Sequence, residues 1–499
     1  GGLRPARRAR GPRGDVCDMG ERMLKFVSRG RETPEKRAAD ARRQDFAEIY
    51  ARFAAARAAE QSARCSQCGV PFCQDHCPLG NNIPDWLRLV AEGRLEEAYA
   101  VSSATNTMPE VCGRICPQDR LCEGSCVIEQ SGHGTVTIGA VEQYITETAF
   151  EKGWVKPIAP VTERAESVGV IGAGPAGLAA AEALRLQGFQ VTVYDRHDRA
   201  GGLLIYGIPN FKLDKAVVAR RVARLVDGGV EFFTDFDVGR DASLAELRER
   251  HSAVLIATGV YKARELLCPG SGEAGVVAAL DYLTASNRKS LGDAVPAFDD
   301  GSLNANGKRV VVVGGGDTAM DCVRTAVRQG AAAVTCLYRR DRANMPGSQR
   351  EVTHAEEEGV VFEWLAAPKA VLGGRAAGVL ATRMRLGLAD DSGRASAQEA
   401  PGSEFTLGAD LVIRALGFDP EDMRAFGDPA LAITKRGTLK VNPLTLETSL
   451  SGVYAAGDIV RGASLVVWAI RDGRVAAASI AARLAAQRNN GARILAAAE

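Results

Sequence analysis

The chain has 499 residues, 46% of them hydrophobic and 25% charged, which is ordinary for a soluble globular protein of about three domains. Its net charge of +1 argues against a nucleic-acid partner or an anionic membrane surface. Gly, Pro or charged residues interrupt every apolar run before it reaches the roughly 18 residues of a membrane span. Because His is scarce and no Ser/His/Asp or Cys/His arrangement occurs, we expect no hydrolase.

The first part of the chain is expected to be an α-helical domain over residues 19–160. The sequence predicts one helix over 33–62 and another over 83–97, and no alternating strand pattern interrupts them. Residues 1–18 are rich in Arg and Gly and are expected to be a disordered or non-native tail. A transit peptide is the less favoured interpretation of this tail, because it contains Gly and Pro and lacks Ser.

Eight cysteines of this helical part form two runs. The runs are Cys65-x2-Cys68-x4-Cys73-x3-Cys77-Pro and Cys112-x3-Cys116-x5-Cys122-x3-Cys126. Zinc sites usually repeat a Cys-x2-Cys pair, and only one such pair occurs here, whereas Pro after the last Cys is typical of ferredoxin runs. We therefore expect two 4Fe–4S clusters, with zinc and disulfides as alternatives. Disulfides suit short secreted chains, and no signal peptide is evident, so we expect a reducing cytoplasm.

A dinucleotide-binding pattern follows the helical part. An apolar strand over 168–171 leads into the loop Gly172-Ala173-Gly174-Pro175-Ala176-Gly177, then a helix and a strand over 190–194. In this arrangement the loop N–H groups hold a pyrophosphate, and an acid at the end of the second strand binds a ribose. The candidate binding residues are Gly172, Gly174, Pro175, Ala176, Gly177 and Asp195.

The same unit recurs with a strand over 309–313, a Gly314-Gly315-Gly316 loop, a helix and a strand over 334–338. Its second strand ends in two arginines, which favour the additional phosphate of NADPH over NADH. A solvated basic turn is the alternative. Two such units predict two Rossmann-like nucleotide-binding domains in an α/β chain. The candidate residues are Gly314, Gly316, Asp317, Thr318, Ala319, Arg339 and Arg340.

Two further strand ends complete the nucleotide-binding pattern. Ala257-Thr258-Gly259 ends one apolar strand, and Ala456-Gly457-Asp458 ends another before a helix near Ser464. An Asp at the second position can bind a ribityl or pyrophosphate group, and a helix N-terminus can stabilise negative charge on a reduced flavin. We therefore add Gly259, Gly457 and Asp458 to the candidates.

These motifs together resemble the small (β) subunit of bacterial NADPH-dependent glutamate synthase. The same module is similar to the N-terminal half of dihydropyrimidine dehydrogenase and to NADPH–ferredoxin transhydrogenase subunits. The resemblance is carried by residues 65–73, 77–86, 112–117, 201–209, 315–321 and 456–458. It implies a disulfide-oxidoreductase-like flavoprotein with a helical double 4Fe–4S domain (19–160), an FAD-binding domain in two parts (161–290 and 441–499) and an NADPH-binding domain between them (291–440).

The resemblance also implies ligands for the clusters, which would cross the two cysteine runs. One cluster would take Cys65, Cys68, Cys73 and Cys126. The other would take Cys77, Cys116, Cys122 and a non-cysteine ligand, for which Glu142 aligns with a Gln of dihydropyrimidine dehydrogenase. Cys112 as the fourth ligand of this second cluster stays open.

The implied function is electron input. NADPH would reduce FAD in a pocket lined by Gly202 and Leu203, and the clusters would pass the electrons on, with no catalytic acid or base. The implied partner is the large (α) glutamate synthase subunit, which makes glutamate from glutamine and 2-oxoglutarate. The alternative partners are ferredoxin, as in a transhydrogenase, and a pyrimidine dehydrogenase partner. A scaffold with purely structural clusters is the remaining hypothesis.

Overall fold

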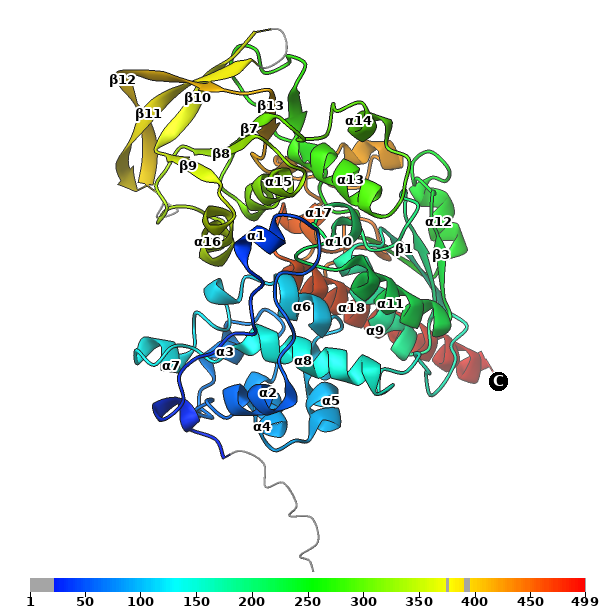
Figure 1. Ribbon diagram of the computed structural model, residues 1–499. Helices are drawn as coiled ribbons and strands as arrows, with labels where there is room; N and C mark the ends of the chain where they lie inside the picture. The colour runs from blue at the N-terminus through cyan, green and yellow to red at the C-terminus, as the bar shows by residue number, and fades with distance from the viewer. Residues whose placement is uncertain (1–21, 374–376, 390–394, 499) are drawn as a thin grey trace, which may run out of the picture.

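The computed structural model describes residues 22–373, 377–389 and 395–498, so the predicted tail over 1–18 lies outside the described residues. The chain forms a helical part that carries the eight cysteines and two parts built on parallel sheets (Figure 1). No helix in the described ranges has both the length and the apolar character that a membrane crossing requires.

The cysteine-bearing part is helical, as predicted, and its core forms where α4 and α8 pack together. Trp86 of α4 and Ile145 of α8 are completely buried in it. Its helices are η1 (Lys25–Val27), α1 (Ala39–Arg42), α2 (Ala55–Ser62), α3 (Phe72–Asp75), α4 (Ile83–Ala91), α5 (Leu95–Thr105), α6 (Pro109–Ile115), η2 (Gln118–Arg120), α7 (Val127–Gln130) and α8 (Ile138–Glu151).

The prediction of one helix over 33–62 is wrong. The segment contains α1 and α2 with a non-helical stretch between them, because Arg37 binds Asp45 through two hydrogen bonds and its N–H donates to the Ile49 carbonyl. These contacts close a loop that local propensity does not reveal. The predicted helix over 83–97 is also broken, at Gly93, whose φ of 76° lies outside the helical region.

The first sheet has the order β15-β4-β1-β2-β3, with all neighbours parallel. Helix α9 follows the glycine loop, and α18 packs closely against it, since a Cβ on Gly473 would lie 2.1 Å from the Ala176 carbonyl. The elements are β1 (Ser167–Ile171), α9 (Pro175–Leu186), β2 (Gln190–Tyr194), α10 (Leu203–Tyr206), α11 (Lys215–Asp227), β3 (Val230–Phe233), α12 (Leu244–Arg250), β4 (Ala253–Ile256), η3 (Met423–Phe426), β15 (Val453–Ala455), α17 (Asp458–Arg461) and α18 (Val466–Ala498).

The second sheet has the order β6-β13-β7-β8-β9 and is also parallel. A three-stranded antiparallel sheet, β10-β11-β12, projects from it (yellow in Figure 1) and was not predicted. The elements are β6 (Val276–Ala278), α13 (Ala279–Ser290), α14 (Pro296–Asp299), β7 (Arg309–Val313), α15 (Asp317–Arg328), β8 (Ala333–Tyr338), α16 (Gln349–Glu357), β9 (Val361–Trp364), β10 (Ala366–Leu372), β11 (Gly378–Ala389), β12 (Ala395–Gly408) and β13 (Leu411–Arg414).

The chain passes between the two sheets through a two-stranded link, β5 (Lys262–Ala263) paired with β14 (Phe418–Asp419). The structure differs here from the predicted ranges 161–290 and 291–440. Strand β6 and helix α13 belong to the second sheet, while η3 packs in the core of the first. Strand pairing over long sequence separations sets these borders, and local patterns do not encode it.

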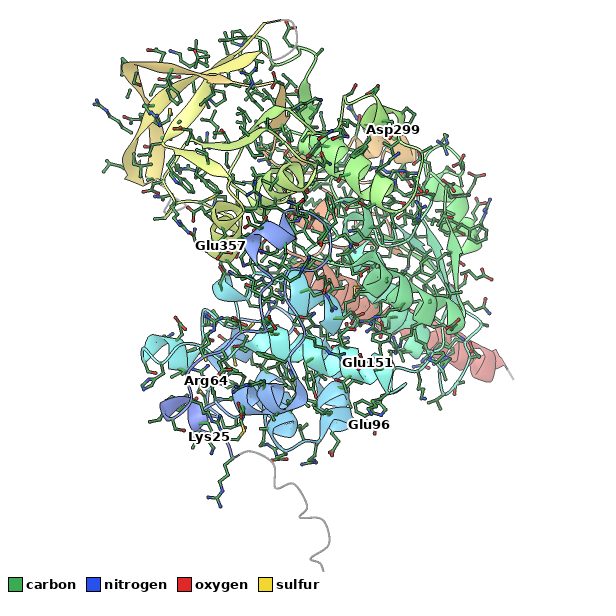
Figure 2. The ribbon with its side chains drawn as sticks, viewed as in Figure 1. Lys25, Arg64, Glu96, Glu151, Asp299 and Glu357 are labelled. Carbon is green, nitrogen blue, oxygen red and sulfur yellow. The ribbon has the colours of Figure 1, made fainter. Side chains whose placement is uncertain are left out.

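The segment over 36–50, which includes α1, leaves the helical part and lies against α16 beside the second sheet (Figure 1). Lys36 and Arg42 both bind Glu357, at 2.6 and 2.7 Å, and Glu357 marks this junction in Figure 2. The hydroxyl of Tyr50 lies 2.8 Å from Nε2 of His354. These contacts tie the cysteine-bearing part to the second nucleotide-binding part.

Candidate functional site

A pocket lies at the carboxyl ends of β1, β4 and β15, where the first glycine loop, the Thr258 turn and the start of α17 meet. Ligands of open parallel sheets bind at this edge. Most of the predicted residues for the first nucleotide line the pocket, namely Gly172, Gly174, Pro175, Ala176, Asp195, Leu203, Gly259 and Asp458. Gly177, Gly202 and Gly457 stand beside it and shape its backbone.

The glycine loop is built for a ligand that approaches its backbone closely. Gly172 has a φ of 107°, and a Cβ on Gly177 would lie 1.9 Å from the Gly172 carbonyl oxygen. In contrast, a Cβ on Gly174 would meet no atom within 4 Å. The open space over Gly174, next to the N-terminus of α9, is where the fingerprint holds a pyrophosphate.

Asp195 has both of its carboxylate oxygens engaged with the backbone. Oδ2 accepts from the Ala173 N–H at 2.7 Å and Oδ1 accepts from the His197 N–H at 2.8 Å. Beyond Asp195 the pocket continues between His197, Thr258 and Tyr261. His197 Nε2 and Thr258 Oγ1 are buried without a hydrogen-bond partner among the described residues. Such orphaned polar atoms suit the polar nucleotide end of an FAD molecule.

The other end of the pocket is apolar, with Leu203, Ile208 and Leu465 on its walls, and suits an isoalloxazine ring. Lys215, which sequence reasoning missed, lies beneath it and donates to the carbonyls of Leu204, at 2.9 Å, and Ile208. Burial lowers the pKa of Lys215 to about 7. Lys215 is the first residue of amphipathic α11, and nothing in the sequence indicated that its amine would be buried.

The second glycine loop repeats the geometry of the first. A Cβ on Gly314 would lie 2.2 Å from the Ala415 carbonyl oxygen, whereas a Cβ on Gly316 would meet no atom within 4 Å. Asp317 accepts a hydrogen bond from the Ser348 N–H at 2.9 Å, which ties the second glycine loop to the start of α16. Thr318 and Ala319 continue the first turn of α15, where Ala319 is buried.

The two predicted arginines follow β8 at the edge of this second loop. Arg339 is exposed, while Nε of Arg340 donates to the Ala395 carbonyl at 2.7 Å. The guanidinium of Arg339 is therefore available to a phosphate, whereas that of Arg340 is hydrogen-bonded to β12 of the projecting sheet.

The first predicted cluster set gathers at the outer end of the helical part. The pKa of Cys73 is raised to about 12, first by burial and then by the nearby thiols of Cys65, Cys126 and Cys68. Cysteines of both runs therefore lie near enough to Cys73 to act on its thiol. Cys68 and Cys73 are partly exposed, whereas Cys65 and Cys126 are buried. We call this group the outer cysteine set.

The second set lines a buried cavity, here called the inner cavity, with Cys77, Cys116, Cys122 and Glu142 on its walls. Cys112 lines it as well, so both candidates for the fourth ligand are present. Burial raises the pKa of Glu142 to about 8. A thiol-rich cavity with a buried carboxylate fits a cluster, because buried charges of this kind otherwise need a partner or a metal.

Two asparagines that the sequence did not single out hold Glu142 in place. Nδ2 of Asn81 and Nδ2 of Asn106 each donate to Oε1 of Glu142 at 3.1 Å. Asn106 Oδ1 in turn lies 3.8 Å from the Cys112 sulfur. Among the described residues, no group of three or more His, Cys, Asp or Glu side chains is arranged to hold a single metal ion.

The inner cavity and the flavin end of the pocket share a thin wall. Ile115 lines the pocket, and the next residue, Cys116, lines the inner cavity. Likewise Val466 lines the pocket, and Val467 lines the inner cavity. The two spaces are therefore separated by neighbouring residues of α6 and α18.

Comparisons with known proteins agree with the division into a cysteine-bearing part and a nucleotide-binding part. Residues 42–154 match the family model described as dihydropyrimidine dehydrogenase domain II, 4Fe-4S cluster, and residues 166–473 match pyridine nucleotide-disulphide oxidoreductase. Among solved structures, FprA from Mycobacterium tuberculosis in complex with NADPH has a TM-score of 0.56 at 20% identity. That match covers 66% of this chain and 86% of FprA, and it supports the fold alone.

Curated relatives cover nearly the whole chain. It is 67% identical over 462 residues to the glutamate synthase (NADPH) small chain of Azospirillum brasilense, which covers 92% of this chain and 96% of that protein. It is 44% identical over 468 residues to the Escherichia coli small chain (93% and 99% covered) and 44% identical to the putative oxidoreductase AegA of E. coli (93% and 71% covered). The chain belongs to the family of glutamate synthase (NADPH) small chains.

Proposed function

We propose that this chain is the electron-input subunit of a glutamate synthase. It oxidises NADPH and delivers the electrons to a large subunit that makes glutamate from glutamine and 2-oxoglutarate. The observation that carries the proposal is the shared wall between the flavin pocket and the inner cavity, at Ile115–Cys116 and Val466–Val467. Family membership supports the partner, and a reducing cytoplasm is the location that suits cysteine-held clusters.

The residues present fit the implied cofactors. Bound FAD would accept a hydride from NADPH and release electrons singly to 4Fe–4S clusters. The Gly172–Gly177 loop would hold the FAD pyrophosphate, and the Gly314–Ala319 segment with Arg339 would hold NADPH. Leu203, Ile208 and Leu465 would exclude water from the ring. No side chain has to move a proton in this scheme, so we assign no catalytic acid or base.

The cysteines would hold two clusters, in the sets that the resemblance implies. The outer set is Cys65, Cys68, Cys73 and Cys126, and the inner set is Cys77, Cys116, Cys122 and Glu142. Between Cys68 and Cys73 of the outer set, the chain carries two exposed apolar side chains, Val70 (65% exposed) and Phe72 (43% exposed). These side chains support an electron exit toward the large subunit, because exposed apolar groups favour a protein contact.

The test is to remove the inner set and follow each half of the reaction. In Cys122→Ser we expect NADPH to bleach the flavin within about threefold of the wild-type rate, since Cys122 lies outside the flavin pocket. Electron delivery to the large subunit should fall at least a hundredfold, because the inner cluster that Cys122 would help to hold is lost. Stopped-flow bleaching and glutamine-dependent NADPH oxidation measure the two halves. Delivery at the wild-type rate from a chain that has lost half of its iron would refute the proposed route.

A second candidate is an electron-input role for another acceptor. The observation that favours it is that the chain is as similar to AegA as to the E. coli small chain, at 44% identity in both cases. In that event purified chain would pass NADPH electrons to ferredoxin or to another reductase, and it would not need the large subunit.

A further inference from the structure

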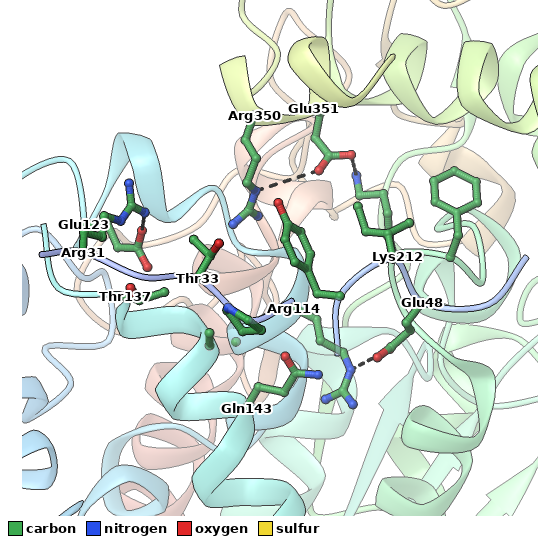
Figure 3. Close-up of a pocket in the computed structure, with 16 residues that line it drawn as sticks. Arg31, Thr33, Glu48, Arg114, Glu123, Thr137, Gln143, Lys212, Arg350 and Glu351 are labelled. Atoms are coloured by element: carbon green, nitrogen blue, oxygen red, sulfur yellow. Dashed lines mark hydrogen bonds and ion pairs between the residues drawn. The ribbon is translucent and has the colours of Figure 1, made fainter. Parts of the chain in front are cut away.

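A second pocket lies directly behind the inner cavity, where the helical part meets α16 and the loop that carries Lys212 (Figure 3). We call it the interdomain pocket. In Figure 3, Arg350 extends into it from α16 and Gln143 faces it from α8 on the other side. The pocket is therefore lined jointly by the nucleotide-binding part and the cysteine-bearing part.

Only one layer of backbone separates the interdomain pocket from the inner cavity. In each of three neighbouring pairs, the first residue lines the inner cavity and the second lines the interdomain pocket. The pairs are Cys112–Gly113, Cys122–Glu123 and Glu142–Gln143. A charge placed in the interdomain pocket consequently acts on the inner cavity across a short path through protein, where it is screened less than in bulk water.

Most cations of the interdomain pocket are already neutralised. Arg31 binds Glu123 at 2.9 Å, and Arg114 binds Glu48 at 2.7 Å. Lys212 has an equally short ion pair, at 2.8 Å, with Asp321. These pairs add little net charge to the pocket.

Arg350 differs from these cations. Among the described residues its buried Nε has no hydrogen-bond partner, and the ion pair recorded for it, to Glu351, is 4.0 Å long. Its side chain is 37% exposed and projects into the pocket (Figure 3). Glu351 itself is shared with Arg324 at 2.5 Å. Among the described residues, Arg350 is thus the cation of the pocket that makes no ion pair shorter than 4.0 Å, although the carboxylates of Glu351, Glu123 and Asp119 lie near it.

The position of Arg350 is fixed from two sides. Two residues before it, the Ser348 N–H donates to Asp317 beside the second glycine loop. The Ser348 hydroxyl donates to both carboxylate oxygens of Asp119, at 3.2 and 3.1 Å, and Asp119 lies between Cys116 and Cys122 in the chain. The start of α16 is therefore anchored to the nucleotide loop and to the cluster-bearing loop together.

We propose that Arg350 raises the reduction potential of the inner cluster, an inference that rests on the proposed function. A 4Fe–4S core with three thiolates and one carboxylate is anionic, and it gains one negative charge with each electron taken up. Net charge near a cluster is one of the determinants of its potential. A fixed positive charge stabilises the reduced form more than the oxidised form, so it favours electron transfer from the flavin into the inner cavity.

The test is a mediated potentiometric titration of the as-purified chain, followed by electron paramagnetic resonance. The signal that is absent from Cys122→Ser identifies the inner cluster. We expect Arg350→Gln to shift the midpoint of that signal to lower potential, and Arg350→Lys to restore most of the wild-type value because it keeps the charge. Flavin and iron content should remain unchanged, and so should the midpoint of the outer cluster.

Arg342→Gln is the matched control. Arg342 lies in the same segment as Arg350, but it binds Glu356 outside the pocket. It should leave both midpoints in place. Equal midpoints for wild type and Arg350→Gln in chains with full iron would overturn this inference and leave the proposed function standing. A wild-type chain without two reducible clusters would overturn both.

Discussion

Gly174→Ala is expected to give a folded chain that purifies with little or no FAD, while Gly316→Ala keeps its FAD and loses NADPH affinity. Neither substitution should disturb the fold, because a Cβ at either position meets no protein atom within 4 Å. The backbone also allows it, with φ of −76° at Gly174 and −90° at Gly316. The added methyl instead occupies the space through which each loop approaches a pyrophosphate.

The expected loss of affinity is at least about tenfold at each site, equivalent to about 1.4 kcal/mol. Flavin absorbance per chain measures the first effect, and anaerobic NADPH titration of the bound flavin measures the second. Gly272→Ala is the control, since Gly272 is exposed and has equally open surroundings. Full FAD occupancy in Gly174→Ala, or unchanged NADPH binding in Gly316→Ala, would show that the corresponding loop does not hold the nucleotide.

Glu142→Ala is expected to lower the iron content from about eight to about four atoms per chain, whereas Cys112→Ala leaves it at about eight. Glu142 shares the inner cavity with three cysteines, and two asparagine amides fix one of its oxygens. Its pKa of about 8 means that the carboxyl holds a proton near neutral pH when no metal is bound, so a metal would take the place of that proton.

Iron and acid-labile sulfide, measured on chains purified without oxygen, separate the two candidates for the fourth ligand. Bound flavin serves as the control for folding, because neither residue lines the flavin pocket. If Cys112→Ala loses half of the iron and Glu142→Ala keeps all of it, Cys112 is the ligand and Glu142 is a buried side chain of the inner cavity that binds no iron.

The sequence predicted most accurately what local patterns encode. Strands β2 and β7 have the bounds that their apolar runs indicated, and the glycine loops lie between strand and helix as expected. The flavin pocket lies where the first glycine loop meets two further strand ends, because the parallel sheet order brings Gly172, Gly259 and Asp458 to one edge.

What the sequence did not reveal depends on contacts between distant segments. The break between α1 and α2 follows from Arg37 and its partners, and the assignment of β6 to the second sheet follows from its pairing with β13. Lys215 donates to the carbonyls of Leu204 and Ile208, and Arg350 lines the interdomain pocket, and both surroundings exist only in the folded chain. Polar residues of this kind look like ordinary surface positions until their surroundings are known.

The central claim is that NADPH electrons collected by this chain serve glutamate formation. The most direct test is an anaerobic affinity purification of the chain from its own cells, followed by an NADPH oxidation assay of the captured complex. We predict oxidation that requires both glutamine and 2-oxoglutarate, together with a co-purified large subunit identified by mass. NADPH-dependent dye reduction that is indifferent to both substrates, with ferredoxin or another reductase as the captured partner, would contradict the claim.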